Sequence, residues 1–571
     1  MLANKKIDAV IVVMLAAALI FTGIFMFAPD LLGITAAATE PEYLAKMFDK
    51  EKITEIEIEA DAEDWQEMLD NATAEEYISC NITINGEKYY NVGIRPKGNS
   101  SLSTVAAMPD SDRYSFKIKM DEYVDGQNYY GLSKFVVNNM QGDATYMKEY
   151  LSYDMFEFLG VNTPAYAFAD ITVNGEEWGF YLAVEAVERE WAERTYGSDY
   201  GQLYKPESMD MGGGAPDGQR NFGEMPDNFN GEMPNDFDGA MPEDFNGEAP
   251  DFGGGNSADG GERPEFGGAA GEAPETGGEF TPPEGGGFAD FGSSGGGADL
   301  VYTDDEIESY SQIFDNAVFG DNKSSDKKRV IKALKVLNTS EDESEIEEYI
   351  DTDEVLRYFA VNTVLVNLDS YVSSFKHNYY LYEEDGVLQI IPWDLNLSFA
   401  GFQVEDASEA VNFPIDTPVM SGIELEERPL IGKLLENENY KNIYHEYINT
   451  LVTEYFDSGY FENKVNELTE LISDYVAGDQ SAFYSYEQFE TAVETLKEFG
   501  RLRAESLNGQ LDGSVPATHS EQLENPEALV SADNINISDM GTQGGGSMNR
   551  EFRERENGGF GGHMMRNNVN N

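Results

Sequence analysis

Residues 379–401 read YYLYEEDGVLQIIPWDLNLSFAG and predict a β-hairpin that ends in a polar corner. β-Branched and aromatic residues flank Glu384-Asp385-Gly386, and an Asp-Gly pair is typical of the tight turn that reverses a strand. Asp394 would then lie where the second strand ends. A carboxylate and a carboxamide at such a corner supply the oxygen ligands that a divalent metal prefers. The alternative is that Trp393 is a buried core residue and Asp394 caps a turn.

Two further polar residues come shortly before this hairpin. Asp369 and Asn378 complete an Asp…Asn…Asp set with Asp394, which is the combination that a phosphoryl-transfer site requires. His377 is interpreted as a hydrogen-bonding loop residue, with a general base as the alternative. Residues 373–376 match the S-x-x-K of penicillin-interacting enzymes, but the partner motifs are missing, so we treat the match as chance.

A basic turn at residues 93–101, GIRPKGNSS, is a candidate for phosphate binding. Backbone amides and cations can together hold a phosphate group. The turn lacks the Walker spacing and the GxGxxG of protein kinases, so a surface turn with solvated lysines remains the alternative. The candidate cofactor-binding residues, including one on the strand that follows, are Arg95, Lys97, Gly98, Asn99, Ser100 and Lys119.

Lys117 and Lys119 fall on one face of the strand predicted at residues 115–119, so one of them can point at a ligand. A helix is predicted over residues 146–159, with Gly160 as its stop signal. Glu149 lies in the first turn of this helix, where it can hold a lysine in place as kinases do. The alternative is an acidic residue favoured by the helix dipole.

The composition excludes several classes of function. The chain has 571 residues and a formal net charge of −70, which argues against DNA or RNA as a partner because nucleic-acid binding depends on neutralising phosphates. It has one cysteine, Cys80, in an alternating run that predicts a buried strand position. An internal disulfide is therefore impossible, and cysteine catalysis is not expected.

The N-terminus predicts a membrane anchor. Residues 9–28 are apolar and uncharged, and about 20 such residues span a hydrocarbon core of roughly 30 Å. Lysines precede the run and acidic residues follow it, which places the N-terminus inside and the rest outside. We therefore expect a single-pass protein of the cell membrane whose bulk is extracytoplasmic. A cleaved signal with a cut near residues 36–38 is the alternative.

The rest of the chain divides by composition into an α+β body with an insertion. Residues 46–206 alternate like strands and contain one helix, which predicts a mixed sheet with one packed helix. Residues 301–511 are mainly helical apart from the hairpin. Residues 207–300 are rich in Gly, Pro and acidic residues and are expected to be disordered. The remaining predicted segments are a stub and anchor at 1–30, a linker at 31–45 and a disordered tail at 512–571.

Six segments in this order together resemble the CotH kinase family of spore coat protein H: GIRPKGNSS, SFKIKM, YMKEYLSYDMFEFLGV, ITVNGEEWGFYLAVEAV, NLDSYVSSFKHNYYLY and IIPWDLNLSFAG. The resemblance covers residues 46–205 and 301–510. It implies an atypical protein-kinase-like fold with two lobes, a sheet-rich N-lobe and a helical C-lobe. It also implies binding of ATP with Mg²⁺ or Mn²⁺, and phosphorylation of Ser or Thr hydroxyls on a coat or surface protein.

The resemblance also assigns roles to residues. By position it implies that Lys117 is the phosphate-binding lysine and that Glu149 is its helix partner. It also implies that Asp369 is the catalytic base, that Asn378 is a metal ligand and that Asp394 is the principal metal aspartate. The family's corner usually reads Trp-Asp-x-Asp. Here its last member is Asn396, which keeps an oxygen ligand but loses a charge. The rival hypothesis is a non-catalytic, kinase-like structural or adhesion module of the cell surface.

Overall fold

Two β-sheets and a set of helices make up the part of the chain that the structure describes. In this computed structural model these are residues 40–206, 297–320, 322–404 and 406–541. All of them belong to one structural unit. The architecture is mixed α and β, as the sequence predicted.

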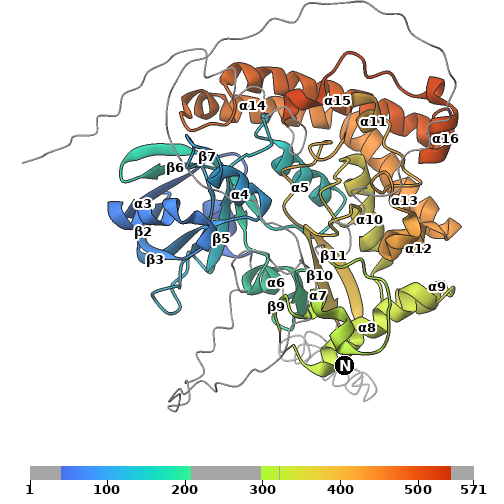
Figure 1. Cartoon of the computed structure of the whole chain (residues 1–571), viewed down its shortest axis with the longest axis horizontal. Coiled ribbons are helices and arrows are strands. Elements are labelled where there is room, and N and C mark those ends of the chain that lie inside the picture. Colours follow the sequence, from blue (N-terminus) through green and yellow to red (C-terminus); the bar gives the residue numbers. More distant parts are fainter. Residues whose placement is uncertain (1–39, 207–296, 321, 405, 542–571) are drawn as a thin grey trace, which may run out of the picture. The chain divides into compact units, whose positions relative to one another are not determined.

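Seven strands among the described residues close into a barrel (Figure 1). Their order is β1-β2-β3-β4-β5-β7-β6, and a parallel β1–β6 pair completes the circle. Side chains alternate, so Ile56 and Ile58 are buried while Glu55 and Glu57 face solvent. The strands are β1 (Thr54–Ala60), β2 (Ile78–Ile84), β3 (Glu87–Lys97), β4 (Ser115–Lys119), β5 (Lys134–Asn138), β6 (Tyr166–Val173) and β7 (Glu176–Glu185). The sheet predicted for this region is therefore closed on itself.

Cys80 is buried on β2, as predicted, and is a free thiol. Burial raises the pKa of this thiol to about 12. A thiol that stays protonated at neutral pH is a poor nucleophile, which agrees with a structural role.

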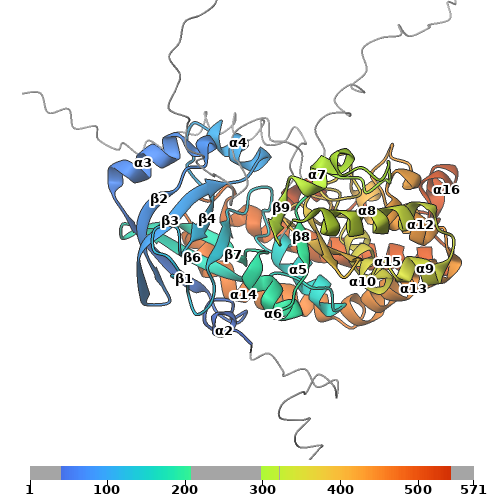
Figure 2. The same ribbon diagram turned by 90° about the horizontal axis from the view of Figure 1, so that it is seen from below.

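The second sheet has the order β11-β10-β8-β9. Its strands are β8 (Gln202–Tyr204), β9 (Ala317–Phe319), β10 (Tyr379–Glu384) and β11 (Val387–Pro392). The predicted hairpin is confirmed, since β10 and β11 pair antiparallel around Asp385 and Gly386. Both turn residues have positive φ angles, 52° and 96°, as a type I′ turn requires. β8 comes from the N-terminal half, so both halves of the chain share this sheet; Figure 2 shows β8 and β9 between the barrel strands and α8 (Ser324–Thr339).

The helix predicted at residues 146–159 is α5 (Lys148–Phe158). It begins two residues later than predicted because Tyr146 has a φ of 59°, outside the helical region. Its Tyr150 ring stacks on Phe168 of the barrel, and its Phe156 ring contacts Tyr358 of α10 (Thr352–Val364). Since α5 is buried on both sides, it joins the barrel to the helical region.

The other helices are α2 (Glu42–Met47), α3 (Ala62–Asp70), α4 (Ser100–Ala106), α6 (Arg189–Tyr196), α7 (Ser311–Phe314), α9 (Glu343–Glu347), α11 (Ala407–Val411), α12 (Pro429–Leu435), α13 (Glu438–Thr450), α14 (Tyr460–Gly478), α15 (Tyr486–Asp512) and α16 (His519–Glu524).

The connection between α14 and α15 is tied to the barrel by a buried ion pair. The guanidinium of Arg113 lies 2.6 Å from the Asp479 carboxylate, and both side chains are 1% exposed.

Both ends of the described region differ from the prediction. The expected linker at 31–45 includes the start of α2, whose Tyr43 hydroxyl donates to Glu185 of β7. The expected tail from residue 512 is ordered to residue 541, with α16 and a 3₁₀ turn, η8 (Ile537–Met540). The amide of Ala144 donates to the Met540 carbonyl, which docks this segment on the loop before α5.

The prediction of a single-pass membrane protein is corrected. No helix in the described ranges is both long enough and apolar enough to cross a membrane. The stretch that suggested the anchor, residues 9–28, lies outside those ranges, as do residues 207–296 of the predicted insertion.

Candidate active site

The hairpin brings two predicted site residues to one end of the sheet. Tyr379 pairs with Pro392, so Asn378 and Asp394 lie just beyond the same end of the β10–β11 ladder. The chain after Asp394 then returns to the end of α10, where the amide of Phe399 donates to the Leu365 carbonyl at 2.7 Å. This contact holds the corner beside the loop that carries Asp369.

Asp369 is the centre of a small hydrogen-bonded group. The Asn378 amide donates to the backbone oxygen of Asp369 at 2.9 Å and to its carboxylate at 3.0 Å. The Nε2 atom of His377 lies 2.7 Å from the other carboxylate oxygen. Phe375 stacks on the His377 ring, and Asp369 is 9% exposed. The structure thus brings Asp369 and Asn378 together and fixes the carboxylate by two side chains.

Glu149 lies in the first turn of α5. It is 2% exposed, and both of its carboxylate oxygens accept hydrogen bonds from the Asn138 amide, at 3.0 and 2.8 Å. Burial, followed by the charge of Asp394, raises the pKa of Glu149 to about 7, while Asn138 and Lys97 act to lower it. Glu149, Asp394 and Lys97 therefore share one electrostatic environment, although they come from α5, the hairpin corner and β3.

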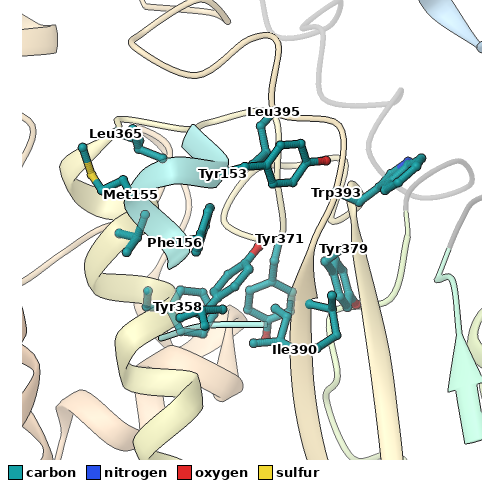
Figure 3. Close-up of a cluster of buried hydrophobic side chains, with 14 of the residues drawn as sticks. Tyr153, Met155, Phe156, Tyr358, Leu365, Tyr371, Tyr379, Ile390, Trp393 and Leu395 are labelled. Atoms are coloured by element: carbon teal, nitrogen blue, oxygen red, sulfur yellow. The ribbon is translucent and has the colours of Figure 1, made fainter. Parts of the chain in front are cut away.

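Trp393 connects the same corner to Lys97. The Lys97 ammonium lies 5.8 Å from the centroid of the Trp393 ring, within cation–π range. Among the described residues no carboxylate lies within ion-pair distance of Lys97. Figure 3 shows Trp393 at the edge of the buried cluster, directed away from Phe156 and Tyr358. The tryptophan is 6% exposed, so it is a core residue as well as a neighbour of the site.

Buried amide groups without partners accompany these residues. The Asn396 amide donates to the backbone oxygen of Gln141 at 3.1 Å. Among the described residues, neither side-chain amide atom of Gln141 has a hydrogen-bond partner, and the Asn138 carbonyl oxygen has none either. Buried polar groups are usually satisfied. Sequence reasoning missed Asn138 and Gln141, since isolated amides carry no motif.

Lys117 and Lys119 take other partners. Lys117 lies 3.6 Å from Glu188, and Lys119 lies 2.8 Å from Glu122. The two lysines share a strand face, as predicted, because Phe116 and Ile118 occupy the barrel interior between them. Glu149, the expected partner of Lys117, is instead hydrogen-bonded to Asn138.

The residues of the basic turn at the end of β3 also have different surroundings from one another. Arg95 lies 2.5 Å from Glu75, and Gly98 has a φ of 130° where the chain turns into α4. Asn99 precedes α4 without capping it by its side chain, and Ser100 is the first residue of that helix. Of the predicted cofactor-binding set, Lys97 is the residue that reaches the hairpin corner.

No group of three or more His, Cys, Asp and Glu side chains that could hold a metal occurs in the described part of the chain. The predicted metal set has a different composition, with one carboxylate from Asp394 and amide oxygens from Asn378 and Asn396. Mg²⁺ is usually held by one or two carboxylates, with waters and substrate phosphates completing its shell. A protein-only cage is therefore not needed at this corner.

Backbone strain gathers at the same place. Non-glycine residues with positive φ angles cluster in the two segments that form the corner and the Asp369 loop: Val366, Lys376, Asn378, Asp394, Phe399, Ala400 and Gln403. Such residues cost on the order of 1–3 kcal/mol each in the least favourable cases and persist where the surroundings impose them. The clustering favours a functional interpretation of the corner over a simple turn.

A cavity of about 370 Å³ lies elsewhere, between α2, the end of α5 and β6. Its charged residues are already paired, since Lys50 contacts Glu157 and Arg194 contacts Glu185. It contains none of the residues that gather at the hairpin corner, so we do not assign the chemistry to it.

Comparison with known proteins identifies the family. The family model described as CotH kinase protein matches residues 94–244 and 294–507. The inner spore coat protein H of Bacillus subtilis (strain 168) is 24% identical over 170 residues, which cover 29% of this chain and 43% of that relative. The chain therefore matches less than half the length of this relative. Because the family model spans most of the sequence, the chain belongs to the CotH kinase protein family.

Proposed function

We propose that this protein transfers a phosphoryl group from ATP to a protein hydroxyl, in a kinase-like arrangement with the barrel and the helical region as its two lobes. One observation carries the proposal. The Lys97 ammonium of the barrel half lies 5.8 Å from the Trp393 ring that precedes Asp394, and the charges of Lys97 and Asp394 both act on the pKa of Glu149. A carboxylate on one side and an ammonium on the other can hold a metal-bound triphosphate between them.

The donor set at the corner fits a hard divalent cation. Asp394 offers a carboxylate, and the amide of Asn378 is used as a donor toward Asp369, which leaves its carbonyl oxygen as the ligand atom. The unpartnered Asn138 oxygen is a further acceptor in this environment. When bound, Mg²⁺ or Mn²⁺ would neutralise charge on the phosphate oxygens. Asn396 provides an oxygen without a charge, so the residues favour an ion that arrives with ATP.

Lys97 takes the role of the phosphate-binding lysine in this proposal, in place of Lys117. Lys117 lies beside Glu188, whereas Lys97 lies beside Trp393 and acts on the pKa of Glu149. Glu149 then orients Lys97 through charge, and Asn138 holds Glu149 in position. A preorganised cation lowers the barrier because it needs no rearrangement as charge develops.

Asp369 accepts the proton of the attacking hydroxyl. Its carboxylate is fixed by Asn378 and His377, so it is oriented before the acceptor arrives. Such positioning accounts for a large part of phosphoryl-transfer catalysis. The acceptor that we propose is a Ser or Thr hydroxyl of a coat or other protein, following the name of the Bacillus relative.

The experiment measures release of ADP from ATP by the full-length chain, with and without Mg²⁺ or Mn²⁺. We expect metal-dependent turnover that Asp394→Asn reduces at least about 100-fold, since one electrostatic contact in a preorganised site is worth this much. Asparagine tolerates the positive φ of Asp394, so the backbone is retained. Asp385→Asn is the matched control, because Asp385 has a similar φ at the other end of the hairpin.

Equal turnover in wild type and Asp394→Asn would remove the assignment. Binding of Mg·ATP without turnover, under conditions in which the chain is folded, would instead support the non-catalytic module.

A further inference from the structure

A second lysine meets the aromatic residues next to Asp394. The ammonium of Lys205 lies 6.0 Å from the centroid of the Trp393 ring and 5.9 Å from that of Tyr380. Lys97 approaches the same tryptophan to 5.8 Å. Two cations from different sheets therefore converge on the ring that immediately precedes Asp394.

The strand register explains how Lys205 reaches this position. Tyr204 pairs with Leu381, so the next residue, Lys205, lies beside Tyr380 on the sheet. The rings of Tyr380 and Trp393 meet edge to face at 5.5 Å. The amide of Lys205 also donates to the Asn316 carbonyl at 3.0 Å, which fixes the backbone. The approach of Lys205 to Trp393 thus follows from the sheet.

The charge balance makes Lys97 unusual. The chain has 37 Lys and Arg residues against 107 Asp and Glu residues, so most cations have abundant acidic partners. Lys97, by contrast, has no carboxylate at ion-pair distance in the described part of the chain. Two ammonium groups beside the ring that precedes Asp394 match a chain of phosphates, which offers a separate charged group to each lysine.

We propose that Lys97 and Lys205 form a polyphosphate-binding pair on Trp393, with Lys205 as a further phosphate-binding residue. The inference rests on the proposed function for the identity of the bound nucleotide, and it adds selectivity for a triphosphate over a single phosphate. The Trp393 ring sets the position of both lysine side chains, and Asp394 is the next residue in the chain.

The competing explanation is that Lys205 only packs its aliphatic stem on aromatic rings, as lysines commonly do. Lys205→Met separates the two explanations because methionine keeps the apolar stem and removes the charge. Lys205→Arg keeps the charge. Lys327→Met is the matched control, since Lys327 lies over Phe314 at 5.5 Å in α8, outside the site.

The test is calorimetric titration of the full-length chain with sodium tripolyphosphate and with inorganic phosphate, in chelator and at constant ionic strength. The metal-free probe keeps this result independent of the metal ligands. We expect tripolyphosphate to bind more tightly than phosphate, and Lys205→Met and Lys97→Met each to weaken it at least about tenfold, because each removes one charge contact. Lys205→Arg and Lys327→Met are expected to stay within about threefold of wild type.

Wild-type affinity in Lys205→Met, or an equal loss in Lys327→Met, would overturn the inference. The two proposals fail separately. Metal-dependent ATP turnover without any effect of Lys205 would remove the lysine pair alone. Lysine-dependent tripolyphosphate binding without turnover would remove the phosphoryl-transfer proposal and leave the pair standing.

Discussion

At the scale of single residues, neighbours in sequence were predictable and partners across the fold were not. Asp369 and Asn378 lie nine positions apart in one loop, so their contact follows from local chain geometry. Strand alternation predicted that Lys117 and Lys119 share a face, but alternation does not say which partner that face meets. Lys97 reaches the corner because β3 ends there, and this depends on how the barrel packs against the hairpin.

Kinetics of two lysine variants test this reassignment. Lys97→Met should lower kcat/KM for ATP by about 100-fold or more, because it removes a preorganised cation from the phosphates. Lys117→Met should change it by less than about fivefold, since Lys117 lies beside Glu188 and has no proposed contact with the phosphates. Initial rates across ATP concentrations give both values. The opposite ranking would restore Lys117 as the phosphate-binding lysine.

At the scale of elements, the hairpin and α5 were visible in the sequence, whereas closure of the barrel was not. Asp-Gly between two β-branched runs encodes a turn locally, and the apolar residues of α5 encode a helix. The barrel closes through a parallel pairing of Thr54 with Ala169, which no local pattern records. The ordered segment after α15 was missed for a related reason, because its order depends on docking against distant residues.

Gly386→Val tests the turn that positions the corner. Gly386 has a φ of 96°, which a β-branched residue adopts only under strain, so we expect a loss of about 2 kcal/mol in the free energy of unfolding. Asp385→Gly should change it by less than about 1 kcal/mol, because glycine accepts the φ of that position. Chemical denaturation measures both. Equal stability of Gly386→Val and wild type would mean that the turn is not held in this form.

At the scale of the whole molecule, buried charged side chains link regions of the described chain that lie far apart in sequence. Arg113 of the barrel side meets Asp479 between α14 and α15, and its guanidinium also donates to the carbonyls of Asn139 and Phe180. Lys148 of α5 donates to the carbonyls of Gly142 and Gly541, which connects the C-terminal segment to the loop beside the site. The length and composition of the sequence set limits on the size of this unit, but they could not predict these contacts.

Breaking the first link should destabilise the unit strongly. Arg113→Met leaves Asp479 buried without its cation, and such a change costs about 3–5 kcal/mol. The double variant Arg113→Met, Asp479→Asn should be less destabilised than the single variant, because the buried charge is gone. Denaturant titrations of the wild type, the single variants Arg113→Met and Asp479→Asn, and the double variant form a double-mutant cycle. A double variant that is worse than the sum of both single changes would contradict this account of the pair.

The second link predicts a dependence on pH. Burial lowers the pKa of Lys148 from its usual 10.5 to about 8 in the folded state. Between these values the unfolded chain binds more protons, so stability due to this group rises as the pH rises from about 8 to 10.5. Relative to Lys148→Met, the wild type should gain up to about 3 kcal/mol over this window. Denaturation of both proteins from pH 7.5 to 10.5 measures the difference, and a constant difference would show that folding does not lower the pKa of Lys148.

The most direct test of the shared site is equilibrium binding of Mg²⁺ with a non-hydrolysable ATP analogue to the full-length chain, measured by calorimetry. We expect saturable binding to the wild type that Asp394→Asn and Lys97→Met each weaken at least about tenfold, because the two residues hold the same ligand from two halves of the fold. Asp385→Asn and Lys327→Met should bind as the wild type does. No binding at millimolar concentration, or affinity unchanged by both site variants, would contradict the claim that Asp394 and Lys97 form one nucleotide site.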